Sequence, residues 1–283
     1  MTKTLVRPAA VAGSFYPDDA RVLAAVVEDF LAEAAEAAET AEVAPVAPAA
    51  PPKAVIVPHA GYVYSGPVAA CAYARLRADG AQSRIRRVVL VGPSHYVAFS
   101  GLALPSAEAF ETPLGRVAVD REAVKRALAA PGVSVRDAAH ADEHALEVQL
   151  PFLQRVLGDF EIVPLLAGSA RPEAVAAVLD ALWGGPETLV VISSDLSHYH
   201  DQATARRLDA ATAAAIEAGA LANIGPEDAC GCVGIAGMLA AAPRHRLSIE
   251  RLALATSADT SGPWHSVVGY GAWAFGPRAA YKL

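Results

Sequence analysis

Short apolar runs alternate with segments of helical periodicity along most of the chain. Continuous apolar runs bounded by glycine, proline or polar residues predict buried strands at residues 54–57, 87–91, 160–166 and 188–192. Apolar residues at three- and four-residue intervals predict helices at residues 20–39, 68–77, 143–157, 172–183, 203–218 and 230–241. Shorter apolar runs predict further strands at residues 102–104, 115–119, 248–255 and 266–275.

This alternation predicts an α/β fold, in which helices cover both faces of a mixed, mostly parallel sheet. The 283 residues contain no internal repeat, so we expect a single three-layer domain over residues 1–283. Residues 43–52 are all proline, alanine or valine. This composition predicts a stiff surface connection within that domain rather than a boundary between two domains.

Composition excludes several classes of protein. The 54% hydrophobic content owes much to alanine, and no stretch reaches the roughly 20 apolar residues of a membrane span. The N-terminal residues lack an apolar signal core, so we expect a soluble cytoplasmic protein. The net charge is −7 and basic residues are not clustered, which argues against a nucleic-acid partner. Three cysteines are too few for a disulfide framework, and we expect free thiols.

Three of the predicted buried strands end in a turn that carries histidine. The first and second strands lead to His59 and to His95, and the fourth leads to Asp195 and His198. The carboxyl ends of parallel strands lie at one edge of a sheet, where α/β proteins bind their ligands. We therefore expect these side chains to share one pocket.

Imidazole groups from separate loops are suited to a transition metal, which two histidines and a third ligand can hold with positions left open for substrate. The sequence leaves the third ligand open. Asp195 would complete a two-histidine, one-carboxylate set typical of ferrous iron, whereas Cys230 would favour zinc or copper. Glu143 and His144 lie at the start of a predicted helix, where an acidic residue also has a purely structural explanation.

Six motifs, in this order and spacing, resemble the Memo family, whose prokaryotic members are called AmmeMemoRadiSam system protein B. The motifs are Ala12-Gly13-Ser14-Phe15-Tyr16-Pro17, Pro58-His59-Ala60-Gly61-Tyr62, Gly92-Pro93-Ser94-His95, Asp142-Glu143-His144-Ala145-Leu146-Glu147, Ser193-Ser194-Asp195-Leu196-Ser197-His198 and Cys230-Gly231. The resemblance covers nearly the whole chain. It implies a fold similar to that of the class III extradiol dioxygenases, which hold non-haem iron with two histidines and a glutamate.

Carried over motif by motif, the resemblance implies that His59, His95 and Cys230 bind a metal, with iron or copper expected and zinc as an alternative. Asp195 and His198 would line the same pocket. A cysteine replaces the carboxylate of the dioxygenases, and a thiolate changes both metal preference and redox behaviour. The family's system name also implies two partner proteins, one AMMECR-like and one a radical enzyme that uses S-adenosylmethionine.

Three functions are compatible with these residues. The first is a metal-dependent, dioxygenase-like oxidoreductase in which His198, oriented by Asp195, moves protons, with Glu143 and His144 as further candidates for catalysis. The second is a metal-independent hydrolase or transferase with Cys230 as a nucleophile activated by His198. The third is a non-catalytic module that binds a peptide or a metal. Whether the chain is an enzyme is left open at this point.

Overall fold

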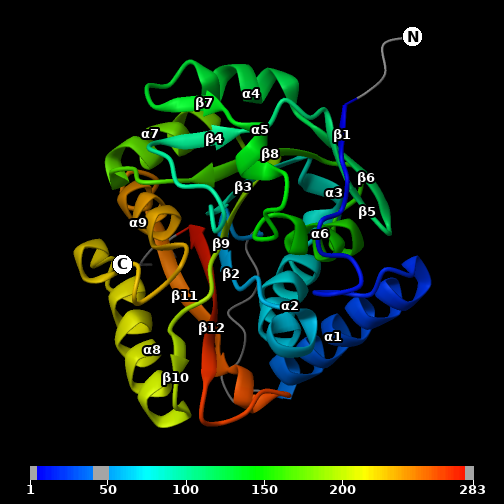
Figure 1. The fold of residues 1–283 in the computed structure, drawn as a ribbon, viewed down its shortest axis with the longest axis vertical. Helices are drawn as coiled ribbons and strands as arrows, with labels where there is room; N and C mark the ends of the chain where they lie inside the picture. The colour runs from blue at the N-terminus through cyan, green and yellow to red at the C-terminus, as the bar shows by residue number, and fades with distance from the viewer. Residues whose placement is uncertain (1–4, 41–50, 278–283) are drawn as a thin grey trace, which may run out of the picture.

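The computed structural model describes residues 5–40 and 51–277, and these residues build a mixed twelve-stranded sheet (Figure 1). The strands are β1 (Val6–Arg7), β2 (Ala54–Val57), β3 (Arg87–Pro93), β4 (Leu102–Leu104), β5 (Ala109–Thr112), β6 (Gly115–Val119), β7 (Val133–Val135), β8 (Glu161–Ala167), β9 (Thr188–Ser193), β10 (His198–His200), β11 (Leu247–Thr256) and β12 (Val267–Pro277).

Parallel strands form the centre of the sheet, in the order β6-β8-β3-β9-β2. The antiparallel strand β12 pairs with β2 and carries β10 and β11 at that side. At the other side β5 pairs with β6 and with β1, while β4 joins β7 to β8. Because β2, β9 and β3 are consecutive and parallel, the loops that follow them leave from one edge of the sheet.

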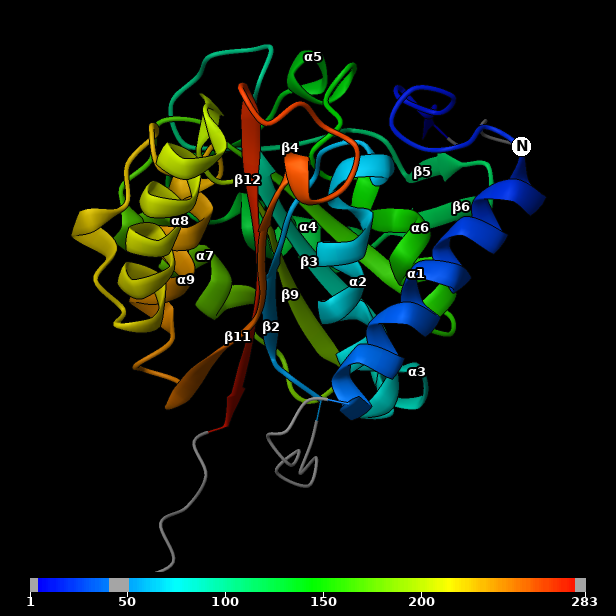
Figure 2. The same cartoon turned by 90° about the horizontal axis from the view of Figure 1, so that it is seen from below.

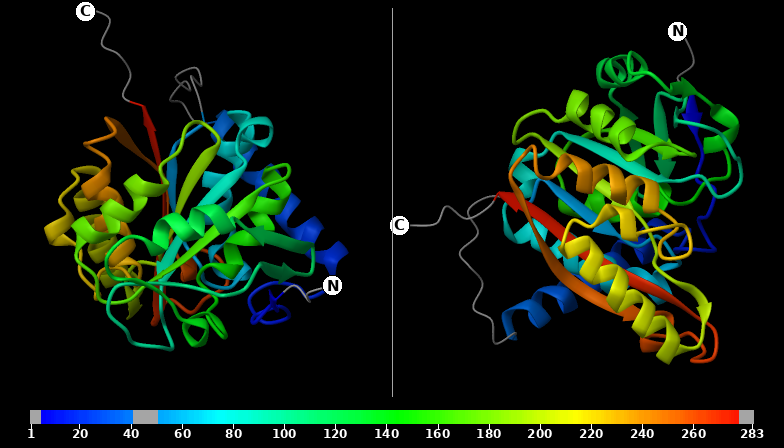
Figure 3. Two further views of the ribbon diagram at one scale, coloured as in Figure 1. Left: turned by 90° about the horizontal axis from the view of Figure 1, so that it is seen from above. Right: turned by 90° about the vertical axis from the view of Figure 1, so that its left-hand side faces the viewer.

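Helices cover both faces of the sheet, as Figure 2 shows. One face carries α1 (Ala20–Thr40), α2 (Tyr62–Ala78), α3 (Ala81–Arg84) and α6 (Leu150–Val156), and the other carries α7 (Pro172–Leu182), α8 (Gln202–Glu217) and α9 (Cys232–Ala241). Helix α8 runs along β11 and β12 (Figure 3). The remaining helical segments are α4 (Arg121–Leu128), α5 (Asp137–His140), η1 (Glu147–Gln149), η2 (Leu221–Asn223) and η3 (Ser257–Asp259).

Local sequence explains these elements. Every residue of β2 and β9 is buried, as expected for strands covered on both faces. Helix α1 buries one apolar stripe with three- and four-residue spacing, formed by Leu23, Val27, Leu31 and Ala34. The Asp19 side chain accepts hydrogen bonds from the first backbone N–H groups of α1, as a helix cap does. The α/β class and the mixed, helix-covered sheet predicted from sequence are therefore confirmed.

Three predicted helices begin two or more residues away from the expected start. Helix α2 begins at Tyr62 instead of residue 68 and includes Pro67 in its second turn. Helical structure predicted from residue 143 begins only at η1, because the Glu143 side chain binds the Ala145 N–H two residues ahead and competes with the helix. Helix α9 begins at Cys232, two residues later than predicted.

The remaining expectations concern residues 43–52, the shortest elements and the possibility of a membrane-spanning helix. The predicted connection at residues 43–52 lies largely outside the described residues. The sequence did not predict the short elements β1, β5, β7, β10, α3, α4, α5, η2 and η3. None of the described helices combines the length and the apolar character that a membrane crossing requires.

Candidate metal centre

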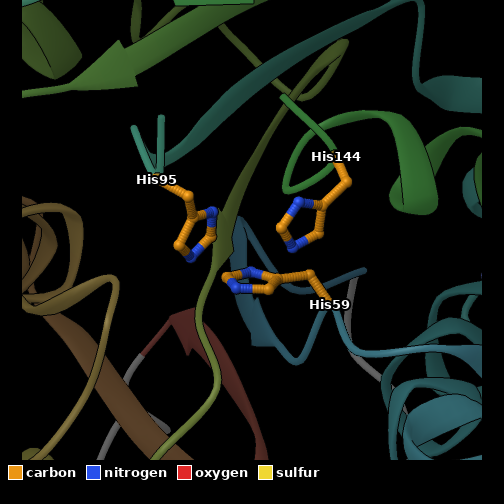
Figure 4. A group of neighbouring side chains, drawn as sticks. All are labelled: His59, His95 and His144. Carbon is orange, nitrogen blue, oxygen red and sulfur yellow. The ribbon is translucent and has the colours of Figure 1, made fainter. Parts of the chain in front are cut away.

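The candidate site lies at the carboxyl edge of the three neighbouring strands β2, β9 and β3. His59 follows β2, His95 follows β3, and Asp195 follows β9, which lies between the other two. A fourth loop, between α5 and η1, brings His144 to the same place. Figure 4 shows the three imidazole rings turned toward a common centre.

The three imidazoles are close enough to share one ion. One ring nitrogen from each of His59, His95 and His144 lies within 4.8 Å of the other two. The ring centroids of His95 and His144 are 4.6 Å apart and stacked, and that of His59 is 5.1 Å and 5.5 Å from them. His59 is only 2% exposed, whereas 27% of the His95 side chain is exposed. The cluster is therefore open to solvent at His95 and closed at His59.

A carboxylate holds His95 in place. Glu143 Oε1 accepts a hydrogen bond from His95 Nδ1 at 2.8 Å, and its Oε2 accepts one from the His95 backbone N–H at 2.6 Å. Burial alone would raise the pKa of Glu143, but the hydrogen bonds from His95 and Ala145 lower this pKa to about 2. An anionic Glu143 fixes the proton of His95 on Nδ1 and leaves Nε2 for a ligand, an arrangement common in metal sites.

Neutral imidazoles occupy the buried part of the site. Burial lowers the pKa of His59 to about 3, and the nearby His95 adds to this effect. Burial also lowers the pKa of His144 to about 4, with His59 as the next cause. The Phe15 ring packs against His144 with 4.6 Å between ring centroids, so the segment before α1 forms part of the wall.

The Cys230 thiol lies directly beside the imidazoles. Its Sγ is 3.2 Å from His59 Nε2 and accepts a hydrogen bond from the Asp195 N–H at 3.3 Å. A Cβ on the next residue, Gly231, would lie 2.6 Å from the Ser193 carbonyl oxygen, so glycine permits this approach. Burial, reinforced by Asp195, raises the pKa of Cys230 well above its usual range. Without a metal this residue is a neutral thiol.

Asp195 and His198 also lie in this region, in a different relation from the one expected. Asp195 is 4% exposed, and its Oδ1 accepts a hydrogen bond from the His59 backbone N–H at 2.7 Å. Its carboxylate therefore positions the backbone of His59 instead of the His198 ring. His198, the first residue of β10, is near enough for its charge to affect Asp195. Burial raises the pKa of Asp195.

The donor set fits a transition metal. Histidine must be neutral to bind a metal, and the buried His59 and His144 already are at neutral pH because their pKa values are low. Glu143 supplies a negative charge behind His95. The structure brings His59, His95 and His144 together as a three-nitrogen group, with the Cys230 sulfur at its edge. Their assignment as ligands or catalytic groups remains a prediction.

Comparison with known proteins identifies the family of the chain. A family model described as Memo-like protein matches residues 7–274. The chain belongs to the Memo family. A MEMO1 family protein of Ignicoccus hospitalis is 38% identical, over 96% of this chain and 99% of its own length. A MEMO1 family protein of Thermotoga neapolitana is 37% identical, over 94% and 98%, and one of Methanobrevibacter smithii is 33% identical, over 96% and 100%.

Membership of the Memo family confirms the resemblance that the six motifs indicated. It covers every motif residue of the site, since Phe15 through Cys230 lie inside the matched region. The likeness to extradiol dioxygenases stays a prediction, as does the metal.

Sequence reasoning missed the residues that hold the Memo-family site together. Ser193 Oγ contacts His59 Nδ1, and Gln149 hydrogen-bonds to Ser193. Glu147 is fully buried and binds Arg7 and Tyr16, which ties the N-terminal segment to η1. A signal was present, because Glu147 and Gln149 are polar residues at positions where an amphipathic helix would bury apolar ones.

Proposed function

We propose that this member of the Memo family is a non-haem metal-dependent oxidoreductase whose metal is held by His59 and His95 with a third protein ligand. The observation that carries the proposal is the convergence of three imidazole nitrogens within 4.8 Å of one another. Iron and copper are the metals proposed, because imidazole with an adjacent sulfur suits redox-active ions. Zinc is the alternative for the same donors.

Two residues compete for the third position. His144 belongs to the three-nitrogen group, whereas Cys230 Sγ is 3.2 Å from His59 Nε2 and would have to lose its proton to bind. A metal ion at the site would compensate for that loss, because coordination deprotonates a thiol. The geometry favours His144 as the third ligand, with Cys230, whose Sγ lies beside His59 Nε2, as an additional ligand.

The bound metal would supply activation of dioxygen or of a small organic substrate. The chain's own residues orient and shield the site. Glu143 holds the His95 ring by its Nδ1 proton, and Asp195 holds the His59 backbone. Asp195 and His198 are the groups proposed to move protons to and from substrate, since a carboxyl group and an imidazole can both transfer protons and burial raises the pKa of Asp195.

Metal content tests the proposal. Protein purified without oxygen and given iron(II), copper(I) or zinc should bind one ion per chain, and His59→Ala or His95→Ala should lose it. His245→Ala is the matched control, because His245 stacks on Trp183 away from the cluster. Oxygen consumption with the iron or copper form then tests the redox part. Equal metal content in wild type and in both site variants would refute the metal centre.

The third ligand can be identified in the same way. We expect His144→Ala to lower zinc affinity more than Cys230→Ala does, because the imidazole belongs to the nitrogen cluster and the thiol is protonated in the free protein. The opposite order of affinities would assign the third position to Cys230.

We also propose that the protein acts in the cytoplasm with an AMMECR-like protein and a radical enzyme that uses S-adenosylmethionine. The support is the resemblance to AmmeMemoRadiSam system protein B described above. Affinity purification of the tagged chain from its own host should recover one or both partners. Recovery of neither, from cells that express both, would count against this part.

A further inference from the structure

A buried chain of hydrogen bonds ends on the ring of His59. Ser193 Oγ lies 2.6 Å from the Ala145 carbonyl oxygen, 2.9 Å from Gln149 Nε2 and 2.9 Å from His59 Nδ1. Gln149 Nε2 also donates to the Pro58 carbonyl oxygen at 2.9 Å. Ser193, Gln149 and His59 are at most 2% exposed, so water does not compete for these bonds.

The orientation of the Gln149 amide follows from its partners. The Pro58 carbonyl oxygen can only accept, so the amide nitrogen of Gln149 faces it. The amide oxygen then accepts from the Tyr73 hydroxyl at 2.8 Å. With the amide reversed, two oxygens would face each other at Pro58. Gln149 therefore donates to Ser193 Oγ.

The position of the imidazole proton follows in turn. A serine hydroxyl has one proton and two acceptor sites. The Ser193 proton goes to the Ala145 carbonyl oxygen, which cannot donate. One acceptor site is taken by Gln149. The remaining contact, to His59 Nδ1, is then a hydrogen bond only if Nδ1 carries the proton.

The proton on Nδ1 determines the state of the other ring nitrogen of His59, Nε2. With its proton on Nδ1, neutral His59 has a lone pair on Nε2, and this atom is the one that faces Cys230 Sγ at 3.2 Å. The other tautomer would place a proton on Nε2 and block it as a ligand. The bond made by one ring nitrogen thus sets what the other can do.

We propose that Ser193 and Gln149 are positioning residues that hold His59 in its Nδ1–H tautomer and so keep Nε2 free to bind a ligand. The value of that lone pair for metal binding rests on the proposed function. The tautomer itself does not, because it follows from bonds within the metal-free chain.

Nuclear magnetic resonance of chelator-treated protein with ¹⁵N-labelled histidine tests the tautomer directly. Loss of one ring signal in His59→Gln assigns His59. We expect wild type to carry the His59 proton on Nδ1, and Ser193→Ala to shift protons to Nε2. Gln149→Met removes a donor to Ser193 Oγ but leaves the Ala145 carbonyl oxygen to accept the serine proton, so we expect a smaller shift in this variant. A wild-type proton on Nε2, or no shift in folded Ser193→Ala protein, would overturn the proposal.

Ser194→Ala is the matched control. Ser194 is also fully buried in the same turn, but its hydroxyl donates to the Asp195 carbonyl oxygen and accepts from the Gly231 N–H. We expect this variant to leave the His59 tautomer unchanged. A shift in Ser194→Ala as large as that in Ser193→Ala would reduce the effect to a general loosening of the turn.

Zinc titration against a chelating dye links the tautomer to binding. We expect Ser193→Ala to weaken zinc binding about 10- to 100-fold, as for other residues that orient a metal ligand, and Ser194→Ala to weaken it less than threefold. If wild type bound none of zinc, iron(II) and copper(I), the proposed metal centre would be refuted and the tautomer result would still stand. Unchanged affinity in a Ser193→Ala protein with an altered tautomer would refute the link between the two.

Discussion

At the scale of single residues, substitution of Glu143 gives the clearest test of how His95 is held. Glu143→Gln keeps the shape of the side chain but removes the charge that holds His95 by two hydrogen bonds. We expect zinc affinity to fall about 10- to 100-fold with little change in fold, measured by competition with a chelating dye. Glu122→Gln is the control, since Glu122 forms an exposed ion pair with Lys125. Equal affinity in both variants would contradict the role given to Glu143.

The Cys230 thiol separates the metal centre from nucleophilic catalysis. Its pKa is raised by burial and by Asp195, and thiolate is the reactive form. We therefore expect iodoacetamide to modify Cys230 slowly in the native, metal-free protein near neutral pH, and quickly after denaturation, as followed by peptide mass spectrometry. The rate should rise steadily with pH through the alkaline range. Fast native labelling that His198→Ala abolishes would support a cysteine nucleophile instead.

Sequence could supply most of the residues of the site, but not how they contact one another. His59, His95 and Asp195 could be found because each follows a predicted buried strand. The relation of Asp195 to His59 instead of His198 depends on backbone positions in two loops, which no local pattern specifies. Ser193 was noted only as the first residue of a motif, and its contact with Gln149, which is distant in sequence, could not be predicted.

At the scale of elements, Glu147 anchors the segment before α1 to η1. Its carboxylate accepts from Arg7, from the Tyr16 hydroxyl and from two backbone N–H groups, and it is fully buried. Removing one partner of a buried ion pair typically costs about 3–5 kcal/mol. We expect Glu147→Gln to lower the free energy of unfolding by about that amount in urea denaturation.

Glu250→Gln is the comparison for that measurement. Glu250 is 58% exposed and pairs with Arg75 at 3.5 Å, and exposed pairs contribute about 0–1 kcal/mol. If both variants lost the same small amount, the anchoring role of Glu147 would be wrong.

Gly92, in β3, lets the loop that carries His144 approach the sheet. A Cβ at this position would lie 2.8 Å from a Leu146 methyl group and 3.2 Å from the Ala145 Cβ. We expect Gly92→Ala to displace this loop, to cost about 1–3 kcal/mol and to weaken zinc binding. Gly276→Ala, whose Cβ would meet nothing within 4 Å, should do neither. Unaltered zinc affinity in Gly92→Ala would show that the loop adapts without moving His144.

The buried strands and long helices could be predicted because their patterns are local. The central strands are apolar between their ends, and α1 repeats its apolar stripe from Leu23 to Ala34, over about three turns. The start of η1 was missed because the Glu143 side chain accepts a hydrogen bond from the Ala145 N–H and so competes with helix formation. The edge strands β1 and β10 are two and three residues long, and their pairing with distant partners defines them.

At the scale of the whole molecule, buried neutral histidines make stability depend on pH. Burial lowers the pKa of His59 to about 3 and those of His140 and His144 to about 4, from 6.5. Between pH 6.5 and 4 the unfolded chain binds more protons than the folded one, so stability falls as the pH falls. We expect each histidine to contribute up to roughly 1.4 kcal/mol per pH unit in this range, measured by urea denaturation of metal-free protein.

His140→Gln isolates one of these contributions. His140 is 3% exposed and hydrogen-bonds the Ala103 carbonyl oxygen, so it lies outside the three-imidazole cluster. In this variant the slope of the free energy of unfolding against pH should decrease by the contribution of one histidine. An unchanged slope would mean that His140 binds no fewer protons in the folded state than in the unfolded state.

The order of the strands has a consequence for how the protein is made in the cell. Strand β9 lies between β2 and β3, yet the ribosome synthesises it after both of them. His59, His95 and His144 therefore leave the ribosome while the place between β2 and β3 is still empty. An incomplete chain that lacks residues 188–193 has no fixed spacing between His59 and His95. Uptake of the proposed metal ion is thus expected only after β9 has been synthesised, and translation products that end before residue 188 should not bind it.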